Sequence, residues 1–399
     1  MMTRKILFFA LIVLMAGCVG KPVKPPIETP PPISKVGPYK AVSWEQVDGW
    51  LLDRPAAALE TFKNSCKAIG RRQQWQLVCA EAAKLDGVSD QVARKFFEDF
   101  FQPNEIRNED GSVDGLITGY YGPELEGSRI KTEQYKYPLY RQPDDLLIID
   151  LDDIYPELDK YRLRGRIVGN RVVPYFERGE IDTGESPLEG KELFWLKDPV
   201  ELFFLHIQGS GRIRLPNGEL IMVGYANQNG HPYRSIGKLL LDRQVMTQDQ
   251  MSMQNIMKWV KQNPEDGQLL LDENPSYVFF RSLPADIQSP PGALGIPLTA
   301  LRSLAVDPHT IPLGAPVFLS TIFPGTDFPL QQLMVAQDTG GAIKGRVRAD
   351  FFWGMGNDAG KIAGKMKQDG RLWVLLPKND SVNHLTRTEK LQGKGGDIN

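Results

Sequence analysis

The spacing of apolar residues changes several times along the chain. Between about residues 50 and 101 apolar side chains recur at three- and four-residue intervals, which predicts three helices. The segments are ALETFKNSCKAI, QWQLVCAEAAKL and DQVARKFFEDFF, separated near Gly70 and Gly87. Ser89 precedes the third segment and is a suitable N-cap residue. From residue 115 to about 225, short runs broken by Gly, Pro and Asp predict β-strands: LITGYY, LLIID, RIVGNRVVPYF, LFFLHI and RIRLP.

The helical spacing returns between residues 234 and 271, in SIGKLLLDR and MSMQNIMKWV. Strand-like runs then resume in YVFFRSL, GIPLTALRSLAVD, PLGAPVFLS, QLMVAQD and RLWVLLP, ahead of a polar tail over 378–399. No fixed-period repeat is apparent. The predicted fold class is therefore α+β, mainly β, with N-terminal helices.

The first residues have the features of an export signal. Arg4 and Lys5 precede an apolar run over 6–16, which is too short to span a bilayer core of ~30 Å. The run leads to Cys18 and resembles a bacterial lipobox, although Met15 stands where Leu is usual. The resemblance implies a signal peptide over 1–17 and lipidation of Cys18. An ordinary signal peptide with an unmodified Cys is the alternative.

The residue after Cys18 is Val19 rather than Asp, which resembles the outer-membrane default of enterobacterial lipoproteins. We therefore expect a lipid-anchored protein of the outer membrane that faces the periplasm. The following segment, KPVKPPIETPPPISKVGP, has seven prolines in eighteen residues and favours an extended polyproline II conformation. Residues 18–40 are accordingly interpreted as the lipidated Cys and a tether.

Charge and cysteine content narrow the function further. The chain has 47 Lys and Arg against 49 Asp and Glu, a formal net charge of −2, so nothing suggests a nucleic-acid partner. Cys66 and Cys79 are the remaining cysteines, and in an oxidising compartment they form either a disulfide or two buried thiols. The four histidines are scattered without metal-ligand spacing, so we expect no metal and no cofactor.

The segment QDTGGAIKGRVRADFFWGMGNDAG, residues 337–360, is the densest in candidate chemistry. It contains three aspartates, Asp338, Asp350 and Asp358, among six glycines. Aromatic residues follow Asp350 directly, and apolar surroundings disfavour an ionised carboxylate, as a general acid requires. Arg346 and Arg348 would have the opposite effect if they approach it. The glycine spacing fits neither a P-loop nor the dinucleotide-binding fingerprint. Ordinary turn-forming Asp and Gly residues are the competing interpretation.

The segment resembles the three-aspartate domain of the membrane-bound lytic murein transglycosylase A family. The motif ADFFWG places the family's catalytic aspartate at Asp350. Other stretches fit in the same order: ITGYYGP at 117–123, HIQGSGRI at 206–213, HPYRSIGKLL at 231–240 and MSMQ at 251–254. The similarity covers nearly all of residues 110–375. Gly122 departs from it, because the family usually has Glu there, and no role of that Glu is carried over.

The resemblance implies a double-psi β-barrel domain formed by residues 41–122 and 288–377. A second, smaller β-barrel over 123–287 would be inserted into it, and a groove would hold a peptidoglycan strand. The implied activity is cleavage of the MurNAc-β-1,4-GlcNAc bond, which leaves a 1,6-anhydro end. Since the sugar's own C6 hydroxyl attacks, one acid/base, Asp350, would suffice. Asp338 and Asp358 would hold loop backbone or raise the proton affinity of Asp350.

Substrate contacts are expected from residues that can approach, hydrogen-bond or stack on sugars. They are Thr118, Gly119, Tyr120, Tyr121, Gln208, Gly209, Ser210, Gly211, Lys344, Phe351 and Trp353. Tyr120 and Tyr121 alternate along a strand, so at most one of them should contact substrate. We interpret His206 as structural. Two alternatives to an enzyme stay open, a glycan-binding lipoprotein without activity and a scaffold that recruits other cell-wall enzymes through its tether.

Overall fold

The computed structural model describes residues 36–158, 161–184, 187–248 and 250–378. The predicted signal peptide, Cys18, most of the tether and the tail after Lys378 lie outside these residues. In the described part of the chain, every helix is too short or too polar to cross a membrane.

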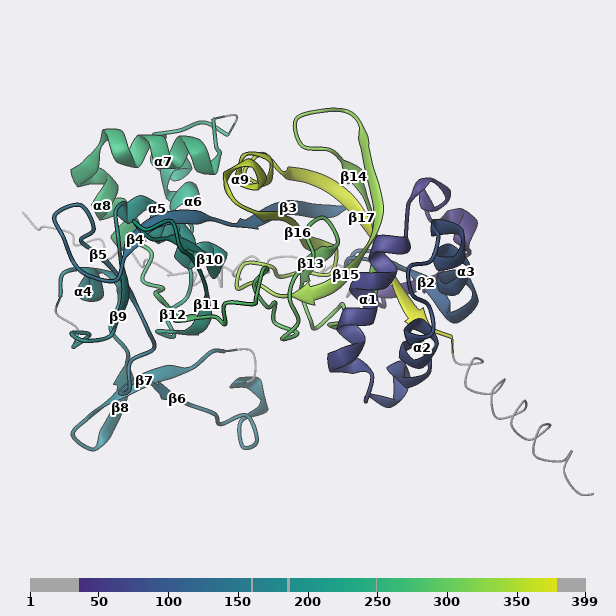
Figure 1. Ribbon diagram of the computed structural model, residues 1–399, viewed down its shortest axis with the longest axis horizontal. Helices are drawn as coiled ribbons and strands as arrows, with labels where there is room; N and C mark the ends of the chain where they lie inside the picture. The colour runs from purple at the N-terminus through teal and green to yellow at the C-terminus, as the bar shows by residue number, and fades with distance from the viewer. Residues whose placement is uncertain (1–35, 159–160, 185–186, 249, 379–399) are drawn as a thin grey trace, which may run out of the picture. The chain divides into compact units, whose positions relative to one another are not determined.

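The predicted N-terminal helices are present as α1 (Ala56–Ile69), α2 (Gln73–Ala83) and α3 (Asp90–Phe100). The Ser89 hydroxyl accepts a hydrogen bond from the backbone N–H of Val92, as its N-cap position predicts. The helices bury Phe62, Trp75 and Phe97 completely. Helix α1 contacts strand β15 (Pro329–Asp338), α2 contacts β17 (Lys367–Pro377) and α3 contacts β2 (Phe101–Ile106) (Figure 1). Short 3-10 helices precede them at Trp44–Gln46 and Trp50–Leu52.

A disulfide between Cys66 and Cys79 joins α1 to α2, which decides between the two alternatives left by the sequence. Replacing both cysteines by alanine is expected to lower the free energy of unfolding by about 3 kcal/mol, because the bridge restricts a short loop in the unfolded chain. Urea unfolding of the double variant and of the wild type measures this. An unchanged midpoint would contradict the expectation, and wild type with a reductant should match the variant.

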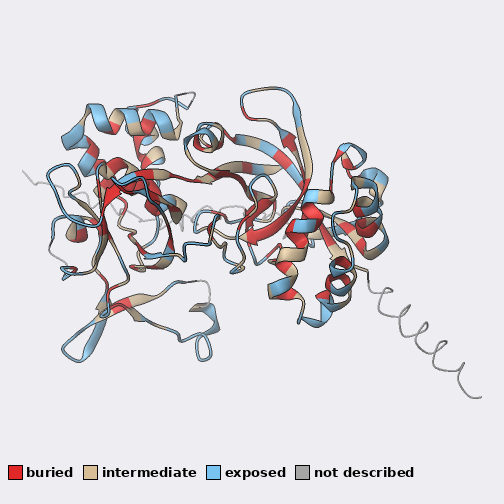
Figure 2. Ribbon diagram, viewed as in Figure 1, coloured by how far each residue is buried: buried red, intermediate tan, exposed pale blue. Residues whose placement is uncertain are grey.

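The first sheet contains eight strands, six of which close on themselves. In order around the ring these are β17, β14, β15, β13, β16 and β3, with β3 paired again to β17. Two further strands, β2 and β1, extend the sheet from β17. The bounds are β1 Tyr39–Ala41, β2 Phe101–Ile106, β3 Gly115–Gly122, β13 Ser303–Val306, β14 Pro316–Ile322, β15 Pro329–Asp338, β16 Arg348–Met355 and β17 Lys367–Pro377. Buried residues concentrate along these strands (Figure 2). Helix α9 (Asn357–Ala363) packs on β3 and β16.

The residues between β3 and β13 form a second, six-stranded sheet with the order β12-β11-β10-β4-β9-β5. A bridge between Arg141 and Phe280 connects its two ends. The bounds are β4 Glu124–Ser128, β5 Tyr137–Tyr140, β9 Glu192–Leu196, β10 Ser210–Arg214, β11 Leu220–Gln228 and β12 Val278–Ser282. A three-stranded sheet is formed by β6 (Leu147–Ile148), β7 (Arg164–Val168) and β8 (Arg171–Pro174), and a 3-10 helix spans Pro156–Leu158. The chain is thus mixed α/β with mainly strands.

Among the described residues of this region, five α-helices accompany the second sheet: α4 Arg178–Asp182, α5 Pro199–Gln208, α6 Ile236–Asp242, α7 Met253–Gln262 and α8 Pro264–Asp272. The prediction of a strand at LFFLHI is wrong, because this run lies within α5. Asp198 caps the helix by accepting from the N–H groups of Val200 and Glu201, and Pro199 suits the first turn. Since α5 is buried on most sides, its apolar run has no periodicity that separates a helix from a strand.

Candidate active site

Asp350 is the third residue of β16, which lies between β13 and β3. Its backbone is opposite Ala305 on the antiparallel side and opposite Thr118 on the parallel side. Side chains alternate along β16, so Ala349 and Phe351 point into the core, whereas Asp350 is only half-buried. The strand therefore presents one carboxylate that is shielded by the barrel and still reachable from solvent.

Thr118 connects Asp350 to a cation. The Thr118 hydroxyl donates a hydrogen bond to Asp350 Oδ1 at 2.7 Å and accepts one from Arg348 Nη2 at 2.9 Å. Asp350 and Arg348 are two residues apart on one strand and therefore share a face. The hydrogen bond from Thr118 orients the Asp350 carboxylate through Oδ1. The other oxygen, Oδ2, is left to carry a transferable proton.

Asp338 ends β15 and is enclosed by donors. Its Oδ1 accepts from the backbone N–H groups of Ala293 and Thr339, each at 2.9 Å. Its Oδ2 accepts from the Tyr120 hydroxyl at 3.0 Å. Asp338 thus holds the start of the loop after β15 and a segment ahead of β13. These three hydrogen bonds stabilise its ionised form against the desolvation that raises its pKa.

Burial is the main cause of the unusual electrostatics at Asp350. It raises the pKa of the Asp350 carboxyl to about 6, and the negative charge of Asp338 acts in the same direction. The Thr118 hydrogen bond and the Arg348 charge oppose this rise. Of the two arginines that could oppose the rise of this pKa, Arg348 is therefore the one that does so. The side chain of Arg346 instead donates to the Val36 carbonyl at 2.6 Å.

Removing the charge of Asp338 should move the titration of Asp350. If protonated Asp350 is the catalytic acid, the rate falls as pH rises through its pKa, which gives the pH–rate profile a descending limb. In Asp338→Asn, we expect this limb to shift to lower pH, because the like charge that raises the pKa of Asp350 is lost. Tyr120→Phe is the matched control, since it removes a hydrogen bond to Asp338 but keeps the carboxylate. A limb that stays at the wild-type pH in Asp338→Asn would show that the two carboxylates are not coupled.

Asp358 does not take the supporting role that was expected. It lies in the first turn of α9 with its side chain almost fully exposed and forms an ion pair with Lys361 at 2.8 Å. The charges that shift the pKa of Asp350 come from Arg348 and Asp338 instead. A negative charge in the first turn of a helix interacts favourably with the helix dipole, so Asp358 stabilises α9 locally.

Phe351 and Trp353 were expected to contact substrate, and the structure corrects this. Phe351 is 1% exposed and Trp353 is 8% exposed, and their rings pack against each other in the barrel core. The Trp353 ring also fills the space beside Gly119, where an added Cβ would come within 2.7 Å of the indole nitrogen. Gly119 is thus required for core packing. The aromatic rings provide the apolar surroundings of β16 without facing a sugar.

The other candidates on β3 have different positions. Tyr120 is buried, and its hydroxyl is engaged by Asp338 inside the protein. Tyr121 is half-buried, and its backbone N–H donates to the side chain of Gln208 at 3.1 Å. Of the pair, Tyr121 is the residue that stays a substrate-contact candidate, together with Thr118.

The HIQGSGRI stretch has mainly structural contacts. Gly209 ends α5 in the left-handed conformation (φ 75°), and an added Cβ at Gly211 would come within 2.7 Å of the Pro123 carbonyl. Ser210 is half-buried at the start of β10 and remains a candidate for contact with substrate. Lys344 lies in a different segment, the loop between β15 and β16, where its side chain is exposed.

His206, which we interpreted as structural, is buried and packed, although its Nε2 has no hydrogen-bond partner among the described residues. Its ring stacks on Phe280, and its Nδ1 lies 3.1 Å from Arg178 Nη2. Burial, with the adjacent Arg178 charge, lowers its pKa well below the usual range.

Sequence reasoning missed the hydrogen bond from Thr118 to Asp350 and that from Tyr120 to Asp338. Thr118 and Asp350 are 232 positions apart, and they meet only through the parallel register of β3 and β16. Of the two arginines named from the sequence as possible opposing charges, Arg348 is the one that lowers the pKa of Asp350. No group of three or more His, Cys, Asp or Glu side chains suited to a metal ion occurs within the described residues.

Comparisons with known proteins agree with the motifs. Residues 116–281 match the family model of the MltA specific insert domain, and residues 302–376 match that of the 3D domain. The chain is 34% identical to the membrane-bound lytic murein transglycosylase A of Escherichia coli over 267 residues. This aligned region covers 65% of this chain and 65% of the E. coli protein. The chain therefore spans about two thirds of the length of that curated relative.

Solved structures extend the similarity to most of the chain. The crystal structure of MltA from Neisseria gonorrhoeae shares 39% identity, with a TM-score of 0.74, over 88% of this chain and 96% of that one. E. coli MltA with bound chitohexaose shares 27% identity and a TM-score of 0.66, over 86% and 96% of the two chains. From its sequence motifs, its two matched domain models and these structures, the chain belongs to the membrane-bound lytic murein transglycosylase A family.

Proposed function

We propose that this protein is a peptidoglycan lytic transglycosylase. It cleaves the MurNAc-β-1,4-GlcNAc bond, forms 1,6-anhydro-MurNAc ends and acts in cell-wall turnover. The observation that carries the proposal is a half-buried Asp350 with its pKa raised to about 6, whose carboxylate accepts a hydrogen bond from the Thr118 hydroxyl. The relatives named above are lytic transglycosylases, and one of them was solved with a bound oligosaccharide.

In the proposed reaction, protonated Asp350 donates its proton to the glycosidic oxygen as the bond from C1 of MurNAc breaks. The C6 hydroxyl of the same sugar attacks C1 and closes the anhydro ring. The Asp350 carboxylate then takes the C6 hydroxyl proton, which regenerates the acid. The intramolecular hydroxyl replaces an activated water, and its proximity supplies much of the rate.

The surroundings of Asp350 support a mechanism with one carboxylate. Retaining and inverting glycosidases use a second carboxylate as nucleophile or base. The adjacent acid, Asp338, has both oxygens engaged by Ala293, Thr339 and Tyr120. It is thus better suited to hold the backbone and to raise the pKa of Asp350 than to attack a sugar.

Digestion of purified sacculi tests the proposal. Wild type should release anhydro-muropeptides that mass spectrometry identifies, and Asp350→Asn should release almost none. Equal release by the two proteins would remove Asp350 from its role. Binding to sacculi without any release by wild type would instead favour a glycan-binding protein.

We also propose a domain architecture and a cellular location for the protein. We take the six-stranded ring as a double-psi β-barrel formed by residues 41–122 and 288–377, with a small barrel over 123–287 inserted. The distribution of strands between the two large sheets supports these boundaries. We place the protein at the outer membrane, anchored through Cys18 and facing the periplasm. Loss of radioactive palmitate labelling in Cys18→Ala would support the anchor, and unchanged labelling would refute it.

A further inference from the structure

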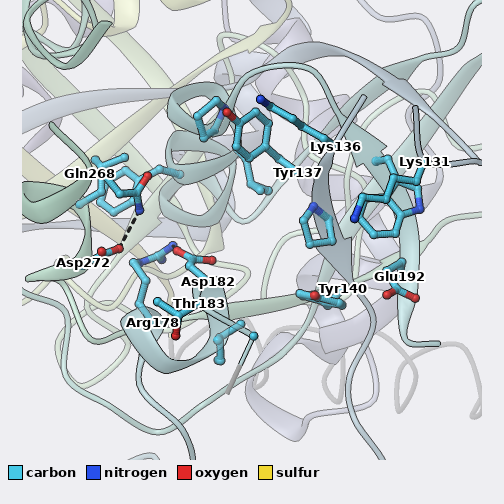
Figure 3. Close-up of a pocket in the computed structure, with 18 of the residues that line it drawn as sticks. Lys131, Lys136, Tyr137, Tyr140, Arg178, Asp182, Thr183, Glu192, Gln268 and Asp272 are labelled. Atoms are coloured by element: carbon cyan, nitrogen blue, oxygen red, sulfur yellow. Dashed lines mark hydrogen bonds and ion pairs between the residues drawn. The ribbon is translucent and has the colours of Figure 1, made fainter. Parts of the chain in front are cut away.

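A cavity of about 500 Å³ lies in the part of the chain between β3 and β13 (Figure 3). Its walls come from β5, β9, α4, α5 and α8. None of its lining residues belongs to β3, β13 or β16, the strands that carry Asp350 and its partners. The volume is in the range of small-ligand sites. The proposed cleavage reaction leaves this cavity without a role.

Arg178 is fixed at one side of the cavity. It is 3% exposed, and its guanidinium lies 4.7 Å from the ring centre of Phe203. Its Nε donates to the Asn274 carbonyl at 3.1 Å and its Nη2 to the Ser276 carbonyl at 2.7 Å. Its Nη1 has the Asp182 carboxylate at 3.8 Å, too far for a hydrogen bond. A buried cation thus keeps donor capacity on one nitrogen.

Two carboxylates line the cavity beside Arg178. Figure 3 shows Asp182 and Asp272 near one another, with Gln268 donating to Asp272 at 2.8 Å. Burial raises the pKa of Asp182 to about 6. The Arg178 charge opposes this rise, and the charge of Asp272 adds to it. A ligand ammonium group placed here would relieve the desolvation and the like-charge repulsion of the two carboxylates.

The opposite side of the cavity carries two exposed lysines (Figure 3). The Lys131 ammonium lies 5.0 Å from the Trp195 ring centre, and that of Lys136 lies 5.4 Å from the Tyr137 ring centre. Glu192 is also on this side, yet among the described residues no ion pair joins either lysine to a carboxylate. The lysines are therefore free to pair with an anionic group that enters the cavity.

From this separation of charges, we infer that the cavity binds a short peptide with both an ammonium group and a carboxylate. The ammonium lies between Asp182 and Asp272, a backbone carbonyl accepts from Arg178 Nη1, and the carboxylate reaches Lys131 and Lys136. The source of the peptide rests on the proposed function: it is the peptide substituent of the wall glycan. The site therefore holds a stem while the glycan is cut elsewhere on the protein.

Isothermal titration of the mature protein with the synthetic stem peptide L-alanyl-γ-D-glutamyl-meso-diaminopimelate tests the inference. We expect saturable binding that weakens about tenfold in Asp182→Asn and about tenfold in the double variant Lys131→Gln with Lys136→Gln, since each loses a charge contact. Lys238→Gln, an exposed lysine on α6 outside the cavity, is the matched control and should bind as wild type does. A peptide in which the free diaminopimelate amine is acetylated and the carboxylates are amidated should bind much more weakly, because the ammonium and the carboxylate that the site recognises are then lost.

Absence of binding by wild type, or equal dissociation constants in all variants, would overturn the inference. Circular dichroism of each variant confirms that a loss of binding is not a loss of folding. Sacculus cleavage is measured in parallel and separates the two proposals. Cleavage without peptide binding would refute this site alone, whereas peptide binding without cleavage would refute only the proposed enzymatic function.

Discussion

Asp350→Asn should lose about 10³-fold of the cleavage rate on sacculi while the protein stays folded. An amide has the shape of the carboxylic acid and can still meet the Thr118 hydroxyl, but it cannot donate and recover a proton. General acid–base catalysis typically contributes factors of ~10² to ~10⁴. A single group that serves both steps should show a loss in the upper part of that range. Initial rates of muropeptide release, measured at equal protein concentration, test this expectation.

The same substitution should stabilise the fold at neutral pH. The folded pKa of Asp350 is about 6, above its ordinary value, so ionisation disfavours the folded state as pH rises through the window between the two values. Above about pH 6, Asn avoids this cost, which we expect to be about 2 kcal/mol after allowance for partial solvent contact. Below about pH 4 the advantage should vanish. Thermal unfolding of both proteins at pH 4 and pH 7 measures it.

Asp358→Asn is the matched control for both parts of this prediction. It removes a carboxylate from the same segment, but Asp358 is exposed and pairs with Lys361. Its activity and its stability should remain close to those of wild type. If Asp358→Asn lost as much activity as Asp350→Asn, or if Asp350→Asn retained most of its activity, the assignment of the acid/base to Asp350 would be wrong.

The pH dependence of kcat/KM should show one descending limb with its midpoint near pH 6. The acid form of Asp350 starts the reaction, so the rate should fall about tenfold per pH unit above the midpoint. A second carboxylate that had to be ionised would add an ascending limb, and the profile would become bell-shaped. Initial rates on solubilised glycan strands between pH 4 and pH 8 give the profile.

Thr118→Val sharpens this second prediction. The hydroxyl lowers the pKa of Asp350 by donating to its ionised form, so its removal should shift the descending limb to higher pH. Valine keeps the shape of threonine and suits the β3 strand. A limb that does not move, or that moves to lower pH, would show that the titrating group is not Asp350.

The sequence was most informative where local physics decides the structure. Helical spacing and the Ser89 cap predicted α1 to α3, because amphipathic periodicity and capping need only neighbouring residues. The same reasoning failed at LFFLHI, where a buried helix is apolar on nearly every side. Phe351 and Trp353 were placed beside substrate although strand alternation puts them on the face opposite Asp350. That error was avoidable, since the period of two was already present in the sequence.

The site itself depended on contacts that no local pattern contains. Asp350 was identified through a motif resemblance, but its partner Thr118 comes from another strand in parallel register. Asp338 is joined to Tyr120 across 218 positions. Such pairings follow from topology and register, which short-range patterns do not specify. The raised pKa of Asp350 is in turn a consequence of the burial that these strands create together.

The central claim is that one carboxylate suffices because the substrate supplies its own nucleophile. Digestion of sacculi in oxygen-18-labelled water tests it most directly. If the C6 hydroxyl attacks, the wild-type products should carry anhydro ends without label, and Asp350→Asn should give neither labelled nor unlabelled ends. Reducing ends that carry the heavy oxygen would show attack by water at C1 and would contradict the account.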